Sequence, residues 1–149
     1  MEEYRVKIEE HAGTMEKLGL SPVAARVYVY LFFCPDHEAS FDEIIQFFDV
    51  SKSAISNALK YLALVDMIEA RTKHGRRKRY FSLRLDNMMS ASLAVSKFEI
   101  LKNMLTDIRT TRKKKDAFAK DLQDIVDFFN LLITEFPVLL EKWKKNTKA

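Results

Sequence analysis

The stretch VSKSAISNALKYL, residues 50–62, governs how the rest of this chain is interpreted. Its apolar residues Ile55, Leu59 and Leu62 are spaced i, i+4 and i+7, which places them on one face of a helix. Ser and Asn compete for backbone hydrogen bonds and are mediocre helix formers, so they do not serve helix stability here. The stretch predicts an amphipathic helix whose polar face is a binding surface for a partner and not an ordinary solvent-exposed face. That face carries lysines and short hydrogen-bonding side chains but no acid: Lys52, Ser53, Ser56, Asn57 and Lys60.

A second short helix is expected just before this one, and both begin at capping residues. Ser40 and Glu43 form the S-x-x-E pattern of a capping box. Residues 49–50 make a tight turn, after which Ser51 is expected to cap the quoted helix, and that helix is expected to end near Leu64. Two short helices joined by so short a turn predict a helix-turn-helix.

Two strands are expected after the helix-turn-helix. Residues 67–71 alternate imperfectly between apolar and polar side chains, and residues 78–85 alternate more regularly. The segment TKHGRRK between them is a basic loop around Gly75. A helix-turn-helix followed by a basic hairpin is the pattern of a winged helix.

Helices are expected on both sides of this winged helix-turn-helix. The first ends near residue 18, and the second, over residues 22–34, is apolar nearly all round and is expected to be buried on several sides. A long helix is expected over residues 86–111, capped by its first residue, Asp86. A last helix follows from about residue 116, and Pro137 is expected to kink or break it.

The expected fold class is therefore mainly α with a small β wing. Residues 1–18 would form an N-terminal dimerisation helix, residues 20–86 a winged helix-turn-helix DNA-binding domain, and residues 87–149 a C-terminal helical dimerisation region. The apolar faces of the terminal helices are longer than so small a winged helix can cover, and a monomer would expose them to water. We therefore expect a homodimer.

The charge of the chain is concentrated in one segment. The net charge is +4, but residues 51–85 hold nine Lys or Arg against two acids, a net charge of +7. The other 114 residues therefore sum to −3. A basic segment within an otherwise acidic chain is the electrostatic footprint expected for a polyanion such as DNA.

The polar face of the quoted helix offers groups that read DNA. Asn57 can pair with adenine through two hydrogen bonds, and Ser51, Ser53 and Ser56 can contact bases or phosphates. Lys52 and Lys60, at the flanks, suit phosphates. The alternative is a solvated helix that merely lacks acids, and the turn before it and the basic hairpin after it favour DNA reading.

The basic loop and the first residue after it, residues 73–79, hold five cations in seven residues. We expect the side chains at its tip to enter a minor groove, where the negative potential favours arginine, and the others to meet phosphates. A solvated basic hairpin is the alternative. The tip residues are Arg76 and Arg77, and the others are Lys73, Lys78 and Arg79.

Other motifs point to ordinary structure. The basic run RTTRKKK, residues 109–115, lies at the end of a predicted helix, where cations are common, so solvent exposure is the preferred interpretation. The segment CPDHE, residues 34–38, holds possible metal ligands without a recognised spacing, so a turn is preferred and no metal site is predicted. Cys34 would act as a redox sensor only with a lowered pKa.

Several classes of function are excluded. No phosphate-binding glycine loop, nucleophile elbow or paired catalytic carboxylates occur, so no catalytic residue is predicted and an enzyme is not expected. No cofactor is predicted, and aromatic stripes that could line an effector cavity are expected to be core packing. The N-terminal segment is unlike a signal peptide, and the longest apolar run is far shorter than a membrane span, so a cytoplasmic protein without membrane association is expected.

Three segments together resemble the MarR superfamily of bacterial transcriptional regulators, in particular its GbsR-type subgroup. They are LGLSPVAARVYVYLFF, SFDEIIQFFDVSKSAISNALKYLALVDMIEA and HGRRKRYFSL, and the resemblance covers residues 16–86. The VSKSAISNALKYL element is its most specific part, and the LGLSP opening favours the subgroup. The flanking helices are similar only in architecture.

This resemblance implies a homodimeric winged-helix regulator, usually a repressor, that binds a pseudo-palindromic operator in double-stranded DNA and is often released by a small-molecule effector. It assigns residues 51–60 to the recognition helix and residues 74–79 to the wing. The wing departs from the family pattern, because KHGRRKR lacks the acid that many MarR proteins carry before the arginine. No effector residue can be matched.

Two other functions use the same fold. A winged helix can serve protein–protein assembly without specific DNA binding, but this function does not require the +7 segment. A winged helix can also bind RNA, for which exposed aromatic side chains are expected, and only Tyr61 and Tyr80 qualify. The sequence leaves open the operator, the regulated genes, the effector and whether the protein represses or activates.

Overall fold

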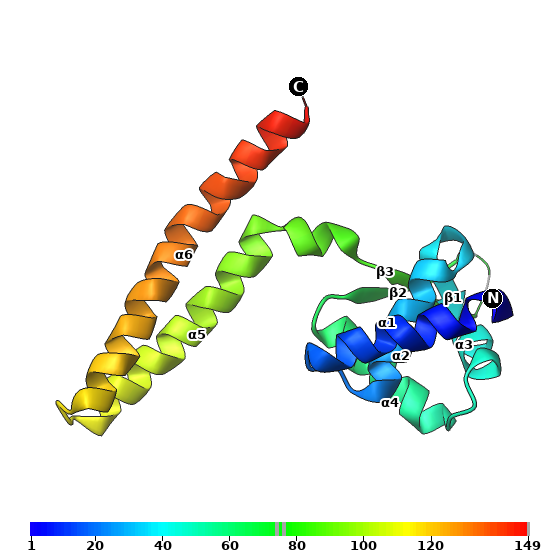
Figure 1. The fold of residues 1–149 in the computed structure, drawn as a ribbon, viewed down its shortest axis with the longest axis horizontal. Coiled ribbons are helices and arrows are strands. Elements are labelled where there is room, and N and C mark those ends of the chain that lie inside the picture. The colour runs from blue at the N-terminus through cyan, green and yellow to red at the C-terminus, as the bar shows by residue number, and fades with distance from the viewer. Residues whose placement is uncertain (74, 76, 149) are drawn as a thin grey trace. The chain divides into compact units, whose positions relative to one another are not determined.

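A computed structural model describes residues 1–73, 75 and 77–148 of the chain. The chain forms two compact units, Met1–Met88 and Met89–Ala149, and Figure 1 shows their elements. It is mainly helical with a small antiparallel sheet, as the sequence predicted. The first unit contains, in order, α1 (Arg5–Lys17), α2 (Pro22–Phe33), β1 (Glu38–Ser40), α3 (Phe41–Phe47), α4 (Lys52–Leu64), β2 (Ile68–Thr72) and β3 (Arg79–Leu83).

Capping residues set the starts of three helices in this unit. The Ser21 hydroxyl accepts a hydrogen bond from the Ala24 amide at 3.3 Å, and Pro22 occupies the first turn of α2. Ser40 and Glu43 form the predicted capping box of α3. Ser51 caps α4, so the helix-turn-helix α3–α4 begins and ends close to the predicted residues.

The wing is one strand larger than predicted. The strand order is β1-β3-β2, with both pairs antiparallel. The sequence predicted β2 and β3 within one or two residues at each end but did not predict β1. This strand has three residues and leads directly into α3, so its sequence shows no alternation to recognise.

Helix α2 forms the centre of the core, as its apolar sequence predicted. It packs against α1 and α4, and seven of its residues are buried. Helix α1 contributes Ile8 and Ala12, and Arg26 of α2 forms an ion pair with Glu9 of α1 at 2.8 Å. Helix α1 therefore belongs to the first compact unit, and its role in dimerisation stays a prediction.

The second unit is a helical hairpin of α5 (Ala91–Arg112) and α6 (Ala117–Thr147), shown in Figure 1. Asp86 does not cap α5: it lies in a 3₁₀ turn, Leu85–Met89, while Ser90 caps the helix. Asp116 caps α6 by accepting a hydrogen bond from the Ala119 amide at 2.9 Å. Helix α6 continues through Pro137, so the predicted break does not occur.

The hairpin buries few of its apolar side chains. Phe98 of α5 stacks on Phe129 of α6, with ring centroids 6.0 Å apart. Of the described residues 89–148, only Leu122 and Val126 are buried. Other apolar side chains, such as Phe98, Phe129 and Phe136, are half-buried. The large exposed apolar side chains of this unit are Met89, Ile100, Leu101, Met104, Ile108, Phe118, Ile125, Phe128, Leu131, Val138, Leu139 and Trp143.

Candidate nucleic-acid interface

Helix α4 is amphipathic, with its apolar and polar residues on the two faces that the sequence predicted. Its buried side is Ile55, Ala58, Leu59 and Leu62, and these residues join the core of the first unit. Its other side is polar, with Ser56 half-buried and Ser51, Lys52, Ser53, Asn57 and Lys60 exposed. No residue of α4 is acidic, so this surface attracts anions without internal competition.

The Ser51 hydroxyl is already engaged in the fold. It accepts a hydrogen bond from the Ala54 amide at 3.2 Å and lies 3.2 Å from the Ser53 hydroxyl. Its main task is therefore to begin α4. The neighbouring Lys52 and Ser53, in the first turn, keep exposed side chains for a ligand.

A cleft of about 590 Å³ lies between α4 and the wing. Lys60 and Ser56 line its helix side, and Phe81 and Ala70 of the sheet contribute apolar surface. The wing side is basic, with Arg77, Lys78 and Arg79, and Asp42 is the single acid among the described residues that line the cleft. Cations thus stand on both walls of one cleft, although they are up to 19 residues apart in sequence.

Asn57 of α4 does not line this cleft. It lines a second hollow, of about 520 Å³, together with Tyr61 and the turn between α1 and α2. Gly19 in that turn has φ of +102°, a conformation that glycine adopts without strain. The predicted α4 residues therefore line two hollows: Ser56 and Lys60 line the cleft beside the wing, and Asn57, three residues before Lys60 on the same exposed face, lines the other.

Lys73 holds the base of the wing together. It follows β2, and its ammonium forms an ion pair with Glu38 of β1. It also lies 4.3 Å from the ring centroid of Tyr80 on β3, the strand between the other two. The Glu38 carboxylate raises the pKa of Lys73, so the charge of this lysine is partly satisfied within the wing.

The remaining wing cations are less constrained. The Lys78 ammonium lies 3.8 Å from the Asp42 carboxylate, and the Arg79 guanidinium lies 5.6 Å from the ring centroid of Phe81. Arg77 is exposed and, among the described residues, forms no ion pair. Arg76, the other predicted tip residue, lies outside the described residues.

A group that the sequence did not reveal fixes the far end of the wing. Arg84, after β3, forms ion pairs with Glu69 of β2 at 3.3 Å and with Asp86 at 3.1 Å. Its hydrogen bonds lower the pKa of Asp86 below the ordinary value. Asn87 donates to the carbonyl of Asp66 at 2.9 Å, which ties the segment after β3 to the turn after α4. No sequence motif marks the pairs of Arg84 with Glu69 and of Asn87 with Asp66, which join residues 15 and 21 positions apart.

The CPDHE segment, residues 34–38, contains a helix end and a turn, which is the interpretation that the sequence favoured over a metal site. Cys34 is the C-cap of α2, and Pro35–His37 form a 3₁₀ turn before β1. Among the residues that the structure describes, no group of three potential metal ligands comes together. Burial raises the pKa of Cys34 to about 11, opposite to the lowered pKa that a redox sensor needs.

We therefore expect Cys34 to react slowly with a thiol reagent. Only the thiolate attacks such reagents, and a pKa of about 11 leaves little thiolate at pH 8. The rate of modification by a disulfide reagent at pH 8 should be about tenfold or more lower in the folded protein than in the unfolded chain. Equal rates in the two states would show that the thiol is accessible and reactive.

Tyr28 and Tyr30 in the aromatic stripe of α2 are core packing, whereas Phe32 is 42% exposed. Tyr28 and Tyr30 are buried, and Tyr30 packs against Phe47 and Phe48 with ring centroids 4.7 and 5.4 Å away. These side chains occupy the interior of the first unit, so they do not form the effector cavity considered from the sequence. In the described part of the chain, no helix has the length and apolarity needed to cross a bilayer.

Comparison with known proteins supports the fold. The chain is similar to the crystal structure of a transcriptional regulator, with a TM-score of 0.79 and 19% sequence identity. The match covers 93% of this chain and 95% of the other. No protein-family model matches the chain, and no curated protein matches it. The likeness establishes a shared fold, a winged helix with additional helices.

Proposed function

We propose that this protein is a sequence-specific regulator of transcription that binds double-stranded DNA as a homodimer. The observation that carries the proposal is the cleft with Lys60 on one wall and Arg77, Lys78 and Arg79 on the other. The cleft lies in a winged helix, and α4, the proposed recognition helix, contains no acidic residue. The solved structure with the same fold, a transcriptional regulator, supports the same role.

Helix α4 has the dimensions and chemistry of a recognition helix. A helix with its side chains is about 10–12 Å across, and the major groove of B-DNA is about 12 Å wide. With α4 in the groove, Asn57 and Ser53 would reach base edges, while Lys52 and Lys60 would meet phosphates. Arg77, Lys78 and Arg79 would follow the backbone beside the groove or enter the adjoining minor groove.

Lys73 has a different part in this proposal. Because it already pairs with Glu38, it contributes mainly by holding the three strands in register. With the strands of the wing held in this way, Arg77, Lys78 and Arg79 would be positioned to contact DNA. Arg76 remains a predicted DNA contact at the tip.

The dimer is proposed from the surface of the second unit. Two buried residues among those described cannot hold a hairpin of this length in water, and a second hairpin would cover its exposed apolar side chains. Two copies would present two recognition helices to half-sites about 34 Å apart, so the operator would be pseudo-palindromic. Occupation of such a site close to a promoter would repress transcription, as the MarR resemblance implies.

We expect Asn57→Ala to relax sequence preference. The operator would first be obtained by selection from a pool of random duplexes. The variant should lose about 1–3 kcal/mol of binding free energy on that operator and should accept other bases at one position per half-site. Its affinity for random DNA should change little, because non-specific binding depends on phosphates.

Asn103→Ala provides the matched control, since Asn103 is an exposed asparagine of α5. It should leave both affinities unchanged. Equal losses on operator and random DNA for Asn57→Ala would exclude base reading by Asn57. Failure to enrich any sequence would favour an assembly module, and stronger binding to single-stranded RNA than to the duplex would favour an RNA reader.

A further inference from the structure

After Lys120 in its first turn, helix α6 and its C-cap, Lys148, carry their charges in two opposite blocks. Residues 121–135 contain four acids and no base, whereas residues 136–148 contain four lysines and one acid. All of these charged side chains are exposed. The acids are Asp121, Asp124, Asp127 and Glu135, and the lysines are Lys142, Lys144, Lys145 and Lys148.

The two blocks mirror one another about a point between residues 134 and 135. Three acids are spaced three residues apart, at 121, 124 and 127, and three lysines have the same spacing at 142, 145 and 148. If a second copy of the helix is reversed about that point, each of these three acids lies opposite one of the three lysines. The same reversal also brings Leu131 onto Val138, whose side chains are 56% and 60% exposed.

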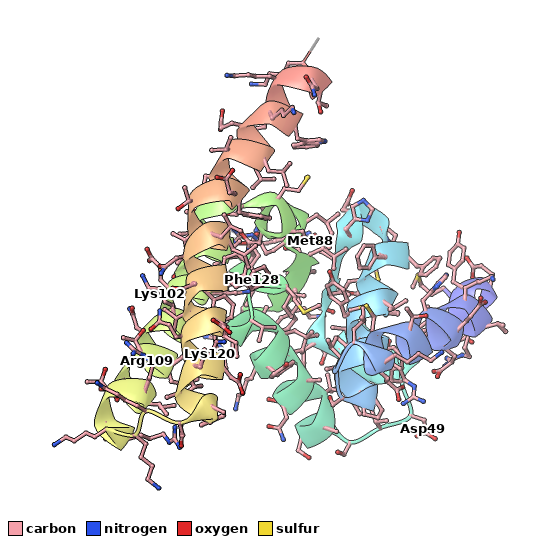
Figure 2. All side chains as sticks on the ribbon, turned by 60° about the vertical axis from the view of Figure 1, so that its left-hand side comes forward. Asp49, Met88, Lys102, Arg109, Lys120 and Phe128 are labelled. Atoms are coloured by element: carbon pink, nitrogen blue, oxygen red, sulfur yellow. The ribbon has the colours of Figure 1, made fainter. Side chains whose placement is uncertain are left out.

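The mirrored residues within α6 lie on the side of the helix that faces away from its own hairpin, and Lys148 follows as the C-cap. Five turns of helix contain 18 residues, so Asp124 and Lys142 point in the same direction. Asp124 lies two residues from both Leu122 and Val126, the buried residues, and is therefore rotated by about 200° from them. Figure 2 shows the hairpin from a second side, with Lys120 and Phe128 on α6.

Interactions within the chain account for only part of this arrangement, since the helix dipole favours Lys144 and Lys145 in the last turn of α6 but does not explain the acids. The helix dipole favours acids in the first turn, but Asp121, Asp124 and Asp127 lie beyond the first turn of a helix that begins at Ala117. Asp127 accepts a hydrogen bond from Gln123 at 2.8 Å. In the described part of the chain, none of these three acids forms an ion pair, while Lys144 pairs weakly with Glu141 at 3.5 Å.

We propose that the α6 helices of two copies pair antiparallel, with the two-fold axis crossing between residues 134 and 135. The acidic block of each copy then faces the lysine block of the other, and Leu131 and Val138 pack at the centre. A parallel pair would set acid against acid and lysine against lysine, which is unfavourable. The inference rests on the proposed homodimer and specifies its geometry and its preference for a second copy of this chain.

Charge reversal in the full-length protein tests this pairing. One variant changes Asp121, Asp124 and Asp127 to Lys, a second changes Lys142, Lys145 and Lys148 to Glu, and a third combines all six changes. Sedimentation at low salt should show each triple variant dissociating at a concentration at least about tenfold higher than wild type. The six-fold variant should dimerise like wild type, and an equimolar mixture of the two triple variants should form heterodimers.

Other outcomes would overturn the proposal. Triple variants that dimerise like wild type would indicate that the two blocks do not face each other. The variant with all six changes still has the original α5. If it dimerises as weakly as the triple variants, the acids of α6 interact with α5 of their own chain and not with the lysines of a second copy. Circular dichroism of the same samples identifies any variant that loses helix, and the heterodimer then provides the deciding measurement. Operator binding is measured separately, so failure of DNA binding in a normal dimer refutes the proposed function and not this pairing.

Discussion

Replacing Lys60 and Arg77 together with alanine is expected to weaken operator binding about a hundredfold at moderate salt. The two side chains stand on opposite walls of the cleft between α4 and the wing. A dimer would lose up to four phosphate contacts, and each lost contact flattens the slope of log K against log salt by about 0.9. We therefore expect a slope shallower by about 2–4.

The measurement is operator affinity at several salt concentrations for wild type and the double variant, with a thermal melt as a control for folding. The melt should be nearly unchanged, because exposed charges contribute little to stability. Lys114→Ala with Lys115→Ala removes two charges from the other basic run, residues 109–115, and should leave the slope unchanged. An unaltered slope for the Lys60 and Arg77 variant would show that the cleft does not bind phosphates.

Truncation after Met88 is expected to leave a folded monomer with greatly weakened operator binding. Of the 22 buried hydrophobic residues among those described, 20 lie in the first unit, so its core remains complete. The fragment would lack the exposed hairpin and so could not link two recognition helices. Linked sites gain from effective concentrations in the millimolar range, and we expect affinity for the complete operator to fall by about a hundredfold or more.

Affinity for an isolated half-site should, in contrast, be similar for the fragment and a wild-type protomer. Circular dichroism, sedimentation and binding to complete and half operators provide the comparison. An unfolded fragment would show that the second unit supports the core. A dimeric fragment would place the dimer contact in residues 1–88, where α1 is the predicted candidate.

The sequence predicted the parts of the fold that depend on local signals. The capping box at Ser40, the Ser51 cap and the period of α4 act within a few residues, so they could be recognised without a structure. Asp86 and Ser90 are both good capping residues. Ser90 caps α5, whereas Asp86 pairs with Arg84, and Arg84 also pairs with Glu69 of β2, 15 positions earlier, which no local pattern reveals.

The candidate site was only partly predictable for the same reason. Helix periodicity identified Lys60, and charge identified Arg77 and Lys78. That these residues line one cleft follows from the packing of α4 beside the wing. The ion pair between Lys73 and Glu38 joins residues 35 positions apart, across a strand that no alternation revealed. Because of this ion pair, Lys73 stabilises the wing, whereas Arg77, Lys78 and Arg79 are the cations proposed to contact DNA.

Hydroxyl-radical footprinting of the full-length protein on its selected operator tests the central claim most directly. A dimer that inserts two α4 helices into successive major grooves should protect two blocks of backbone about 10 base pairs apart, centre to centre. The contacts of Arg77, Lys78 and Arg79 should add protection beside each block, and this added protection should weaken when Arg77 is replaced with alanine. A single protected block, or weak protection spread evenly along the duplex, would contradict a dimeric winged helix that reads DNA.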